Sequence, residues 1–189
     1  AIVIGLGALG SVCSNYLCRA GLGELVLCDF DKIDISNLHR QTLYEESDIG
    51  ESKLDVSIRK LRSINSDCSL VGINKRVNID NLGTLISNGD LVIDATDNFA
   101  SRHQINQVCQ ERKAYLVSGA ALGWLGQISI FNFELPFSPC YECLFGNSTK
   151  EEQSCSDIGV LGPVTGLIGS MQALEVIKKI VDVNVKGSG

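Results

Sequence analysis

Short apolar runs alternate along the chain with longer segments in which apolar residues recur at helical spacing. The runs at residues 1–4 and 91–93 are apolar at every position, which is typical of parallel strands covered on both faces. Strands that alternate with helices form a largely parallel sheet between two layers of helices, so we predict an α/β fold. The expected strands are residues 1–4, 24–28, 69–74, 91–94, 115–119 and 127–132, and the expected helices are residues 9–20, 52–64, 80–87, 101–111 and 161–181.

A glycine motif joins the first expected strand to the first expected helix. It contains Gly5, Gly7, Ala8 and Gly10 in the pattern Gly-x-Gly-x-x-Gly, and Asp29 ends the second strand nineteen residues later. Glycines allow a tight turn and a close approach of phosphate, which the N–H groups of the following helix can bind. An acidic residue about 20 positions on can hold ribose hydroxyls. The pattern predicts a nucleotide site in a Rossmann-like fold, and the alternative is a purely structural turn.

Polar residues after the second strand bear on which nucleotide is bound. They are Asp31, Ser36, Asn37, Arg40 and Lys53. A hydride-transferring dehydrogenase does not need an amide, a guanidinium and an ammonium at this place. A site for a triphosphate does need them, because charge-assisted bonds to phosphate are strong. Either cation taken singly is more simply a solvated surface residue, but the set favours ATP.

A second polar group, Asp97-Asn98, follows the expected strand 91–94. Gly5, Asp29 and this group all stand at strand ends, where parallel sheets bind ligands, so we expect them to converge on one edge. A carboxylate beside a triphosphate can hold Mg²⁺ together with phosphate oxygens and water, which makes Asp97 the candidate ligand. The alternative role of this pair is a helix N-cap.

Composition and charge indicate the class of protein, the partners that it excludes and its cellular location. The chain has 189 residues, of which 44% are apolar and 20% charged, and these values suit a single globular domain over residues 1–189. A net charge of −6 argues against nucleic-acid binding, and no apolar run reaches the length of a membrane span. The eight cysteines fall mostly inside apolar patterns, so we expect reduced, buried thiols and a cytoplasmic location.

Further motifs extend these patterns over nearly the whole chain. They are Ser118-Gly119-Ala120, Gly126-Gln127-Ile128, Cys140-Tyr-Glu-Cys143 and the glycine-rich segment 159–175. With the earlier motifs, in this order, the chain resembles the ThiF/MoeB/HesA family of ubiquitin-activating-type (E1-like) adenylyltransferases. The resemblance implies the MoeB-type activating-enzyme fold, an ATP site and a homodimer. Ala8 departs from the glycine that many relatives carry and narrows the space beside the phosphates.

The resemblance also implies a reaction. ATP would adenylate the C-terminal Gly-Gly carboxylate of a small ubiquitin-like sulfur-carrier protein of the ThiS/MoaD type, in thiamine or molybdopterin biosynthesis. A carboxylate is already nucleophilic at neutral pH, so catalysis requires positioning and charge stabilisation, for which Arg40, Lys53 and Mg²⁺ on Asp97 are the candidates. Two alternatives remain open: an NAD-dependent Rossmann oxidoreductase, and a non-catalytic scaffold subunit that binds a ubiquitin-like protein.

The cysteines of the C-terminal third have separate expected roles. Cys140 and Cys143 form half of a zinc site, since structural zinc requires four ligands, and relatives supply a second Cys-x-x-Cys that is missing from this chain. We therefore expect Zn²⁺ in the full-length protein, and a fragment here that lacks an N-terminal helix and a C-terminal segment. Cys155 aligns with the cysteine that some relatives link covalently to the carrier. The alternatives for Cys155 are a third zinc ligand or an inert loop thiol.

Overall fold

The computed structural model describes residues 1–146 and 159–181. Within them a six-stranded sheet has the order β3-β2-β1-β4-β5-β6, parallel throughout except that β6 runs antiparallel to β5. The mostly parallel α/β fold predicted from the apolar pattern is confirmed. The strands are β1 Ile2–Ile4, β2 Glu24–Cys28, β3 Ser69–Ile73, β4 Leu91–Asp94, β5 Tyr115–Leu122 and β6 Leu125–Asn132.

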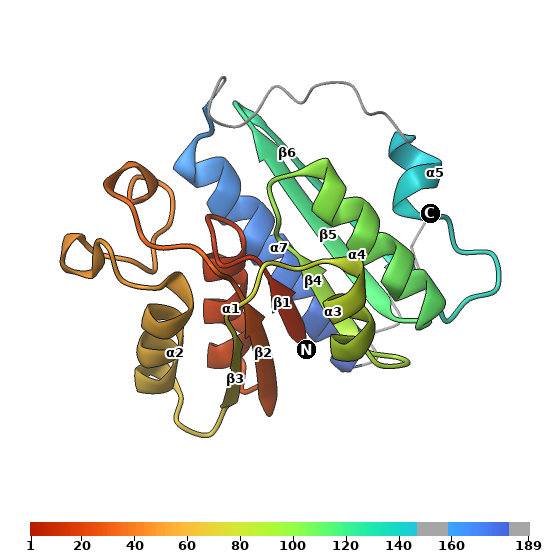
Figure 1. Cartoon of the computed structure of the whole chain (residues 1–189), viewed down its shortest axis with the longest axis horizontal. Coiled ribbons are helices and arrows are strands. Elements are labelled where there is room, and N and C mark those ends of the chain that lie inside the picture. The colour runs from red at the N-terminus through yellow and green to blue at the C-terminus, as the bar shows by residue number, and fades with distance from the viewer. Residues whose placement is uncertain (147–158, 182–189) are drawn as a thin grey trace.

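Helices cover both faces of the sheet (Figure 1). One buried cluster joins the sheet to α1 Gly10–Arg19, α2 Lys53–Ile64 and α7 Gly162–Ile180. The other joins the opposite face to α3 Ile79–Leu85, α4 Phe99–Glu111 and α5 Tyr141–Phe145. Two short 3-10 helices, Ile35–Asn37 and Glu46–Asp48, lie between β2 and α2. Among the helices of the described ranges, none has the length and apolar character that crossing a membrane requires.

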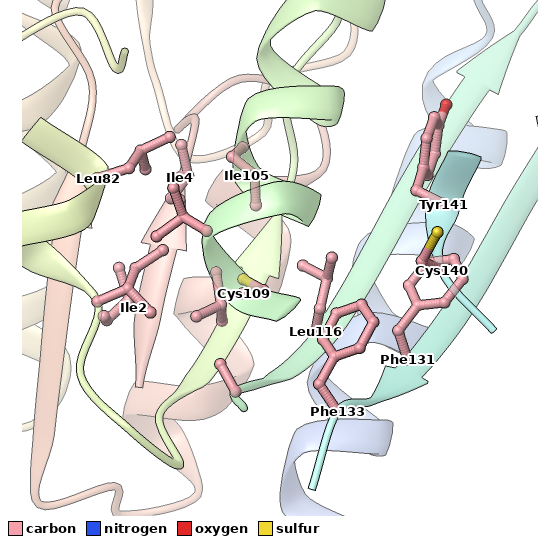
Figure 2. Close-up of a cluster of buried hydrophobic side chains, with 14 of the residues drawn as sticks. Ile2, Ile4, Leu82, Ile105, Cys109, Leu116, Phe131, Phe133, Cys140 and Tyr141 are labelled. Atoms are coloured by element: carbon pink, nitrogen blue, oxygen red, sulfur yellow. The ribbon is translucent and has the colours of Figure 1, made fainter. Parts of the chain in front are cut away.

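Side chains of β1 alternate between these two cores. Val3 packs with the α1, α2 and α7 residues, whereas Ile2 and Ile4 pack on the other side. Figure 2 shows Ile4 beside Ile105 of α4, and Ile2 and Phe131 of β6 belong to the same cluster. A strand buried on both faces has apolar residues at every position, which is why residues 1–4 read as a continuous apolar run.

The helix after β4 begins two residues earlier than the sequence predicted. The Asn98 Oδ1 accepts the N–H of Ser101 at 2.9 Å, so Asn98 is the N-cap and α4 starts at Phe99. This side-chain bond satisfies one of the N–H groups that a helix end leaves free. Asn98 therefore fixes where the loop after β4 ends.

The strand order places a crevice between β1 and β4. From β1 the chain continues to β2 and β3 on one side, and from β4 to β5 and β6 on the other. The loops at the carboxyl ends of these two central strands diverge, and open α/β sheets bind ligands at such a switch point. Gly5 follows β1, and residues 95–98 follow β4, so both loops reach this crevice.

Candidate nucleotide-binding site

A cavity of about 330 Å³ opens at the switch point. Its walls come from the loops that follow β1, β2, β3 and β4, together with the first turns of α2 and α7 and the end of β5. Residues separated widely in sequence meet there because the strands are parallel. The predicted site residues that line it are Gly5, Gly7, Ala8, Asp29, Asp31, Arg40, Lys53, Asp97 and Asn98, whereas Gly10, Ser36 and Asn37 lie outside its lining.

The three glycines of the motif meet different constraints. Gly5 has a φ of +91°, and a Cβ there would come within 2.8 Å of the Ala95 carbonyl oxygen. A Cβ on Gly10 would overlap the carbonyl oxygen of Gly5, so Gly10 allows α1 to start close against β1. At Gly7 a Cβ would meet only the Gln41 Nε2, at an ordinary 3.6 Å. Gly5 and Gly10 are thus required by the fold, while Gly7 leaves space open beside the cavity.

Asp29 braces the glycine turn from the end of β2. Its Oδ2 accepts the N–H of Leu6 at 2.6 Å and its Oδ1 accepts the N–H of Asp31 at 2.8 Å. Burial raises the pKa of the Asp29 carboxyl, and the two backbone hydrogen bonds act in the opposite direction. Asp29 also lines the cavity, so the same residue that supports the turn stands where it can contact a ligand.

Lys53 enters the cavity from the first turn of α2. The Ser52 Oγ caps this helix by accepting the Asp55 N–H at 3.3 Å. The Lys53 side chain is only 8% exposed, and its Nζ lies 3.0 Å from the Asp31 Oδ2. The Lys53 N–H also donates to the Asp31 carbonyl oxygen at 3.0 Å. This double link fixes the ammonium group at the wall of the site.

Arg40 is held by the turn that precedes it. Its Nη1 donates to the Ser36 carbonyl oxygen at 3.0 Å and lies 2.7 Å from the His39 Nε2. Ser36 itself donates its N–H and its hydroxyl to Asp34 Oδ1, at 2.8 and 2.6 Å. Ser36 therefore supports Arg40 through its backbone, and its predicted direct contact with the nucleotide stays a prediction, as does that of Asn37.

The two residues of the Asp97-Asn98 pair are used differently. Asn98 caps α4, as described above, and its Nδ2 donates to the Asp97 Oδ1 at 3.3 Å. Asp97 is exposed and lines the cavity. Behind the pair, the buried Asp94 accepts bonds from Thr96 and Ser118, and the Gln172 Nε2 of α7 donates to the Asp94 carbonyl oxygen at 2.7 Å. The loop that carries Asp97 thus starts from a fixed strand end.

The further residues of the cavity wall that had no role in the sequence prediction include Gln41, Lys75, Arg76 and Arg102. The three added cations, with Arg40 and Lys53, outnumber the lining carboxylates Asp29, Asp31 and Asp97, so the described wall suits a polyanion. Lys75 and Arg76 come directly after β3, and their position at a strand end was the available signal. Gln41 is 4% exposed, and its Oε1 finds no hydrogen-bond partner among the described residues.

The cysteine pair lies at α5, outside the lining of this cavity. The Cys140 and Cys143 sulfurs are 3.2 Å apart, and the hydrogen bond from Cys140 lowers the pKa of the Cys143 thiol. Residues 1–146 and 159–181 contain no cluster of three or more His, Cys, Asp or Glu side chains arranged for a metal. Cys155, the predicted covalent residue, falls outside the described residues.

Comparison with known proteins identifies relatives over the whole fold. A family model described as the ThiF family matches residues 1–188. The chain is 40% identical over 188 residues to the molybdopterin-synthase adenylyltransferase of Escherichia coli K12, covering 100% of this chain and 75% of that protein. It is 39% identical over 178 residues to the sulfur carrier protein ThiS adenylyltransferase of the same organism, covering 94% of this chain and 70% of that protein.

Other relatives are longer than this chain. The adenylyltransferase and sulfurtransferase MOCS3 of Culex quinquefasciatus is 42% identical over 182 residues, which cover 95% of this chain and 41% of that protein. Among solved structures, E. coli MccB with ATP superposes with a TM-score of 0.82 at 24% identity, over 96% of this chain and 55% of that one. This likeness concerns the fold. The chain therefore spans between about two fifths and three quarters of these proteins.

Proposed function

The chain belongs to the ThiF family, and on this premise we propose that it acts as a single adenylation domain on a sulfur-carrier protein. It would use ATP to adenylate the C-terminal glycine carboxylate of a small ubiquitin-like carrier of the ThiS/MoaD type. The names of the relatives, a molybdopterin-synthase adenylyltransferase and a ThiS adenylyltransferase, support this function. The observation that carries it is the convergence of Gly7, Arg40, Lys53 and Asp97 on one cavity.

The residues of the cavity meet the chemical demands of this reaction. A C-terminal carboxylate, with a pKa near 3.5, is ionised at neutral pH and needs no general base. Its oxygen bonds to the α-phosphorus of ATP, while the bond from that phosphorus to the oxygen bridging the α- and β-phosphates breaks and pyrophosphate leaves. Negative charge on the phosphates is the main barrier, so positioned cations supply most of the catalysis. Lys53 is fixed by Asp31 and Arg40 by the Ser36 carbonyl, and both side chains are therefore preorganised.

Magnesium fits the carboxylate side of the cavity. Mg²⁺ is usually held by one or two carboxylates, with phosphates and water completing the shell. Asp97 is exposed, lines the cavity and is free of the capping role that Asn98 takes. Asp97 would hold the ion, which would neutralise phosphate charge and orient the triphosphate.

Zinc fits the cysteine pair as half of a site. The two sulfurs are close enough to bind one ion, and the lowered pKa of Cys143 favours the thiolate that zinc requires. The two remaining ligands would come from chain that the structure does not describe. The described cysteines are all free thiols, and this supports a reducing, cytoplasmic location.

A homodimer is part of the same proposal. On α7, Leu167, Met171 and Leu174 are exposed at helical spacing, and Ile130 is exposed on β6, against which α7 packs. Exposed apolar patches of this kind mark surfaces that associate. A second copy of the chain is the occupant that we propose for this surface.

Exchange of labelled pyrophosphate into ATP tests the function. Carrier-dependent exchange is expected in the purified protein, and Arg40→Ala or Asp97→Ala should lower it at least about 100-fold, because each removes a charge-stabilising group. Arg62→Ala, which changes an exposed arginine in the last turn of α2, is the matched control and should retain normal exchange. Normal exchange in both Arg40→Ala and Asp97→Ala would refute the site.

Ligand-induced stabilisation separates the alternatives. ATP with Mg²⁺ should raise the melting temperature and NAD should not, since only a bound ligand stabilises the folded state. The opposite result would favour an oxidoreductase. A protein that binds the carrier but shows no exchange would be a scaffold subunit.

Cys155 is proposed as a covalent residue that acts after adenylation. Cys155→Ser should leave pyrophosphate exchange intact, because adenylation uses no thiol, and should abolish any covalent adduct with the carrier. Full thiocarboxylate formation by Cys155→Ser would make this cysteine a bystander.

A further inference from the structure

Both polar groups of the Leu6 backbone are held by side chains. Its N–H donates to the Asp29 Oδ2 at 2.6 Å, and its carbonyl oxygen accepts the hydroxyl of Tyr44 at 2.7 Å. Leu6 stands between Gly5 and Gly7, so the peptide planes of the glycine turn are fixed from two directions. Asp29 was expected at this site from the sequence, whereas Tyr44 was not.

Tyr44 is buried and connects the turn to α2. Tyr44 is only 5% exposed. Its hydroxyl oxygen lies 3.0 Å from the Ser57 Oγ and 3.5 Å from the Lys53 carbonyl oxygen. A phenol has one proton, and the short bond to Leu6 uses it, so Ser57 donates to Tyr44. Burial raises the pKa of the Tyr44 hydroxyl, which therefore stays a donor at neutral pH.

The bond to Leu6 determines the direction of the next N–H group. A trans peptide is planar, so the Leu6 carbonyl and the Gly7 N–H point in opposite directions. Tyr44 draws the carbonyl toward α2. Within the described residues the Gly7 N–H donates to no protein acceptor, and Gly7 lines the cavity. A free N–H beside a cationic cavity is a ready contact for an anion.

We propose that Tyr44 is a positioning residue that aims the Gly7 N–H at a phosphate group of the bound nucleotide. The same hydroxyl ties the glycine turn to the helix that begins with Lys53, so that the backbone donor and the ammonium group keep a fixed separation. This inference rests on the proposed function, because it assumes that ATP occupies the cavity.

Tyr44→Phe removes the hydroxyl and keeps the ring. Its dissociation constant for ATP should rise about 10-fold, the effect of losing one well-aligned hydrogen bond. Adenosine, which has no phosphate, should bind within about twofold of its wild-type affinity. The KM for ATP in pyrophosphate exchange should rise in parallel, while the rate at saturating ATP changes less than about threefold.

Ser57→Ala is the matched control. It removes the bond on the α2 side of Tyr44 and leaves the bond to Leu6, so it should lower the melting temperature without a change in ATP affinity greater than about twofold. A purely structural role for Tyr44 predicts that Tyr44→Phe weakens the binding of ATP and of adenosine by the same factor, and that result would overturn the inference. A wild-type protein that binds no ATP would instead overturn the proposed function.

Discussion

At the scale of single residues, the glycine motif combines positions required by the fold with one that leaves room for a ligand. A methyl group on Gly10 would overlap the backbone of Gly5, whereas a methyl group on Gly7 would meet only the end of the Gln41 side chain. Glycine is therefore required for packing at Gly10, whereas at Gly7, three residues earlier, it leaves space open beside the cavity. The roles of Gly10 and Gly7 can be distinguished by experiment.

Gly10→Ala should mainly affect the free energy of unfolding, and Gly7→Ala should mainly affect ATP binding. Alanine is the better helix former by about 1 kcal/mol, yet Gly10→Ala should lower the free energy of unfolding by about 3 kcal/mol, because the clash is with backbone. Gly7→Ala should change that free energy by less than about 0.5 kcal/mol and weaken ATP binding. Urea denaturation and ATP titration of the two variants provide the measurements. A stabilised Gly10→Ala protein would contradict the packing role.

At the scale of elements, an ion-pair network attaches the loop before α2 to that helix. Asp48, whose side chain is 4% exposed, accepts from the Lys60 Nζ at 2.6 Å and the Arg59 Nη2 at 2.9 Å. It also accepts the N–H of Glu45 at 2.9 Å in a capping box. Because Lys53 begins the same helix, this network helps to hold the cavity wall.

The Asp48 network makes a prediction about pH. Burial alone would raise the pKa of Asp48, but the bonds from Lys60, Glu45 N–H and Arg59 hold it below its usual value. A carboxyl with a depressed folded pKa contributes stability that is complete above its unfolded pKa, about 3.9, and is lost as pH falls through the folded pKa. Asp48→Asn should therefore lower the free energy of unfolding by about 2 kcal/mol at pH 7.

The difference between Asp48→Asn and wild type should shrink when denaturation is repeated near pH 3. A difference that is equal at both pH values would show that the charge of Asp48 is not what stabilises the loop. Asp67→Asn, at an exposed position just before β3, is the control and should match wild type at both pH values.

The bounds of a strand were predictable from sequence where burial makes every residue apolar. They were less predictable where glycines interrupt the apolar run. The expected strands ended at 119 and began again at 127, yet β5 and β6 continue to Leu122 and from Leu125 as a hairpin. A Cβ on Gly119 would lie 2.6 Å from Gln172, and a Cβ on Gly126 would lie 2.6 Å from Ile168. These glycines mark the close approach of α7 to the sheet, which sequence alone cannot distinguish from a strand end.

Among the residues of the candidate site, too, some were predictable from sequence and others were not. Asp29 and Asp97 were predictable because they stand at the ends of apolar runs. Arg76 and Tyr44 were not, because their places depend on which strands are neighbours and on how the loop after β2 folds back against Leu6. The helix α5 was also missed, since five residues carry too little periodicity to predict.

At the scale of the whole molecule, α7 has two apolar faces. One, which includes Ala173 and Val176, packs into the core with α1 and the sheet. The other presents Leu167, 61% exposed, and Leu174, 54% exposed, on the outside. A helix that covers only one face of a sheet needs one apolar face, so the second is a surface suited to association with a partner.

We expect that partner to be a second copy of the chain, and light scattering of the purified protein should give the mass of a dimer. A charge placed at the centre of such an interface is costly to desolvate, so Leu167→Glu should shift the protein toward monomer. Val71→Lys, at an exposed apolar position on β3 across the sheet, is the control and should remain dimeric.

Because α7 also holds the end of β4 through Gln172, loss of the dimer should loosen the loop that carries Asp97 and reduce pyrophosphate exchange. A wild-type protein that is monomeric at all concentrations tested, and fully active, would rule out both the dimer and its link to the site.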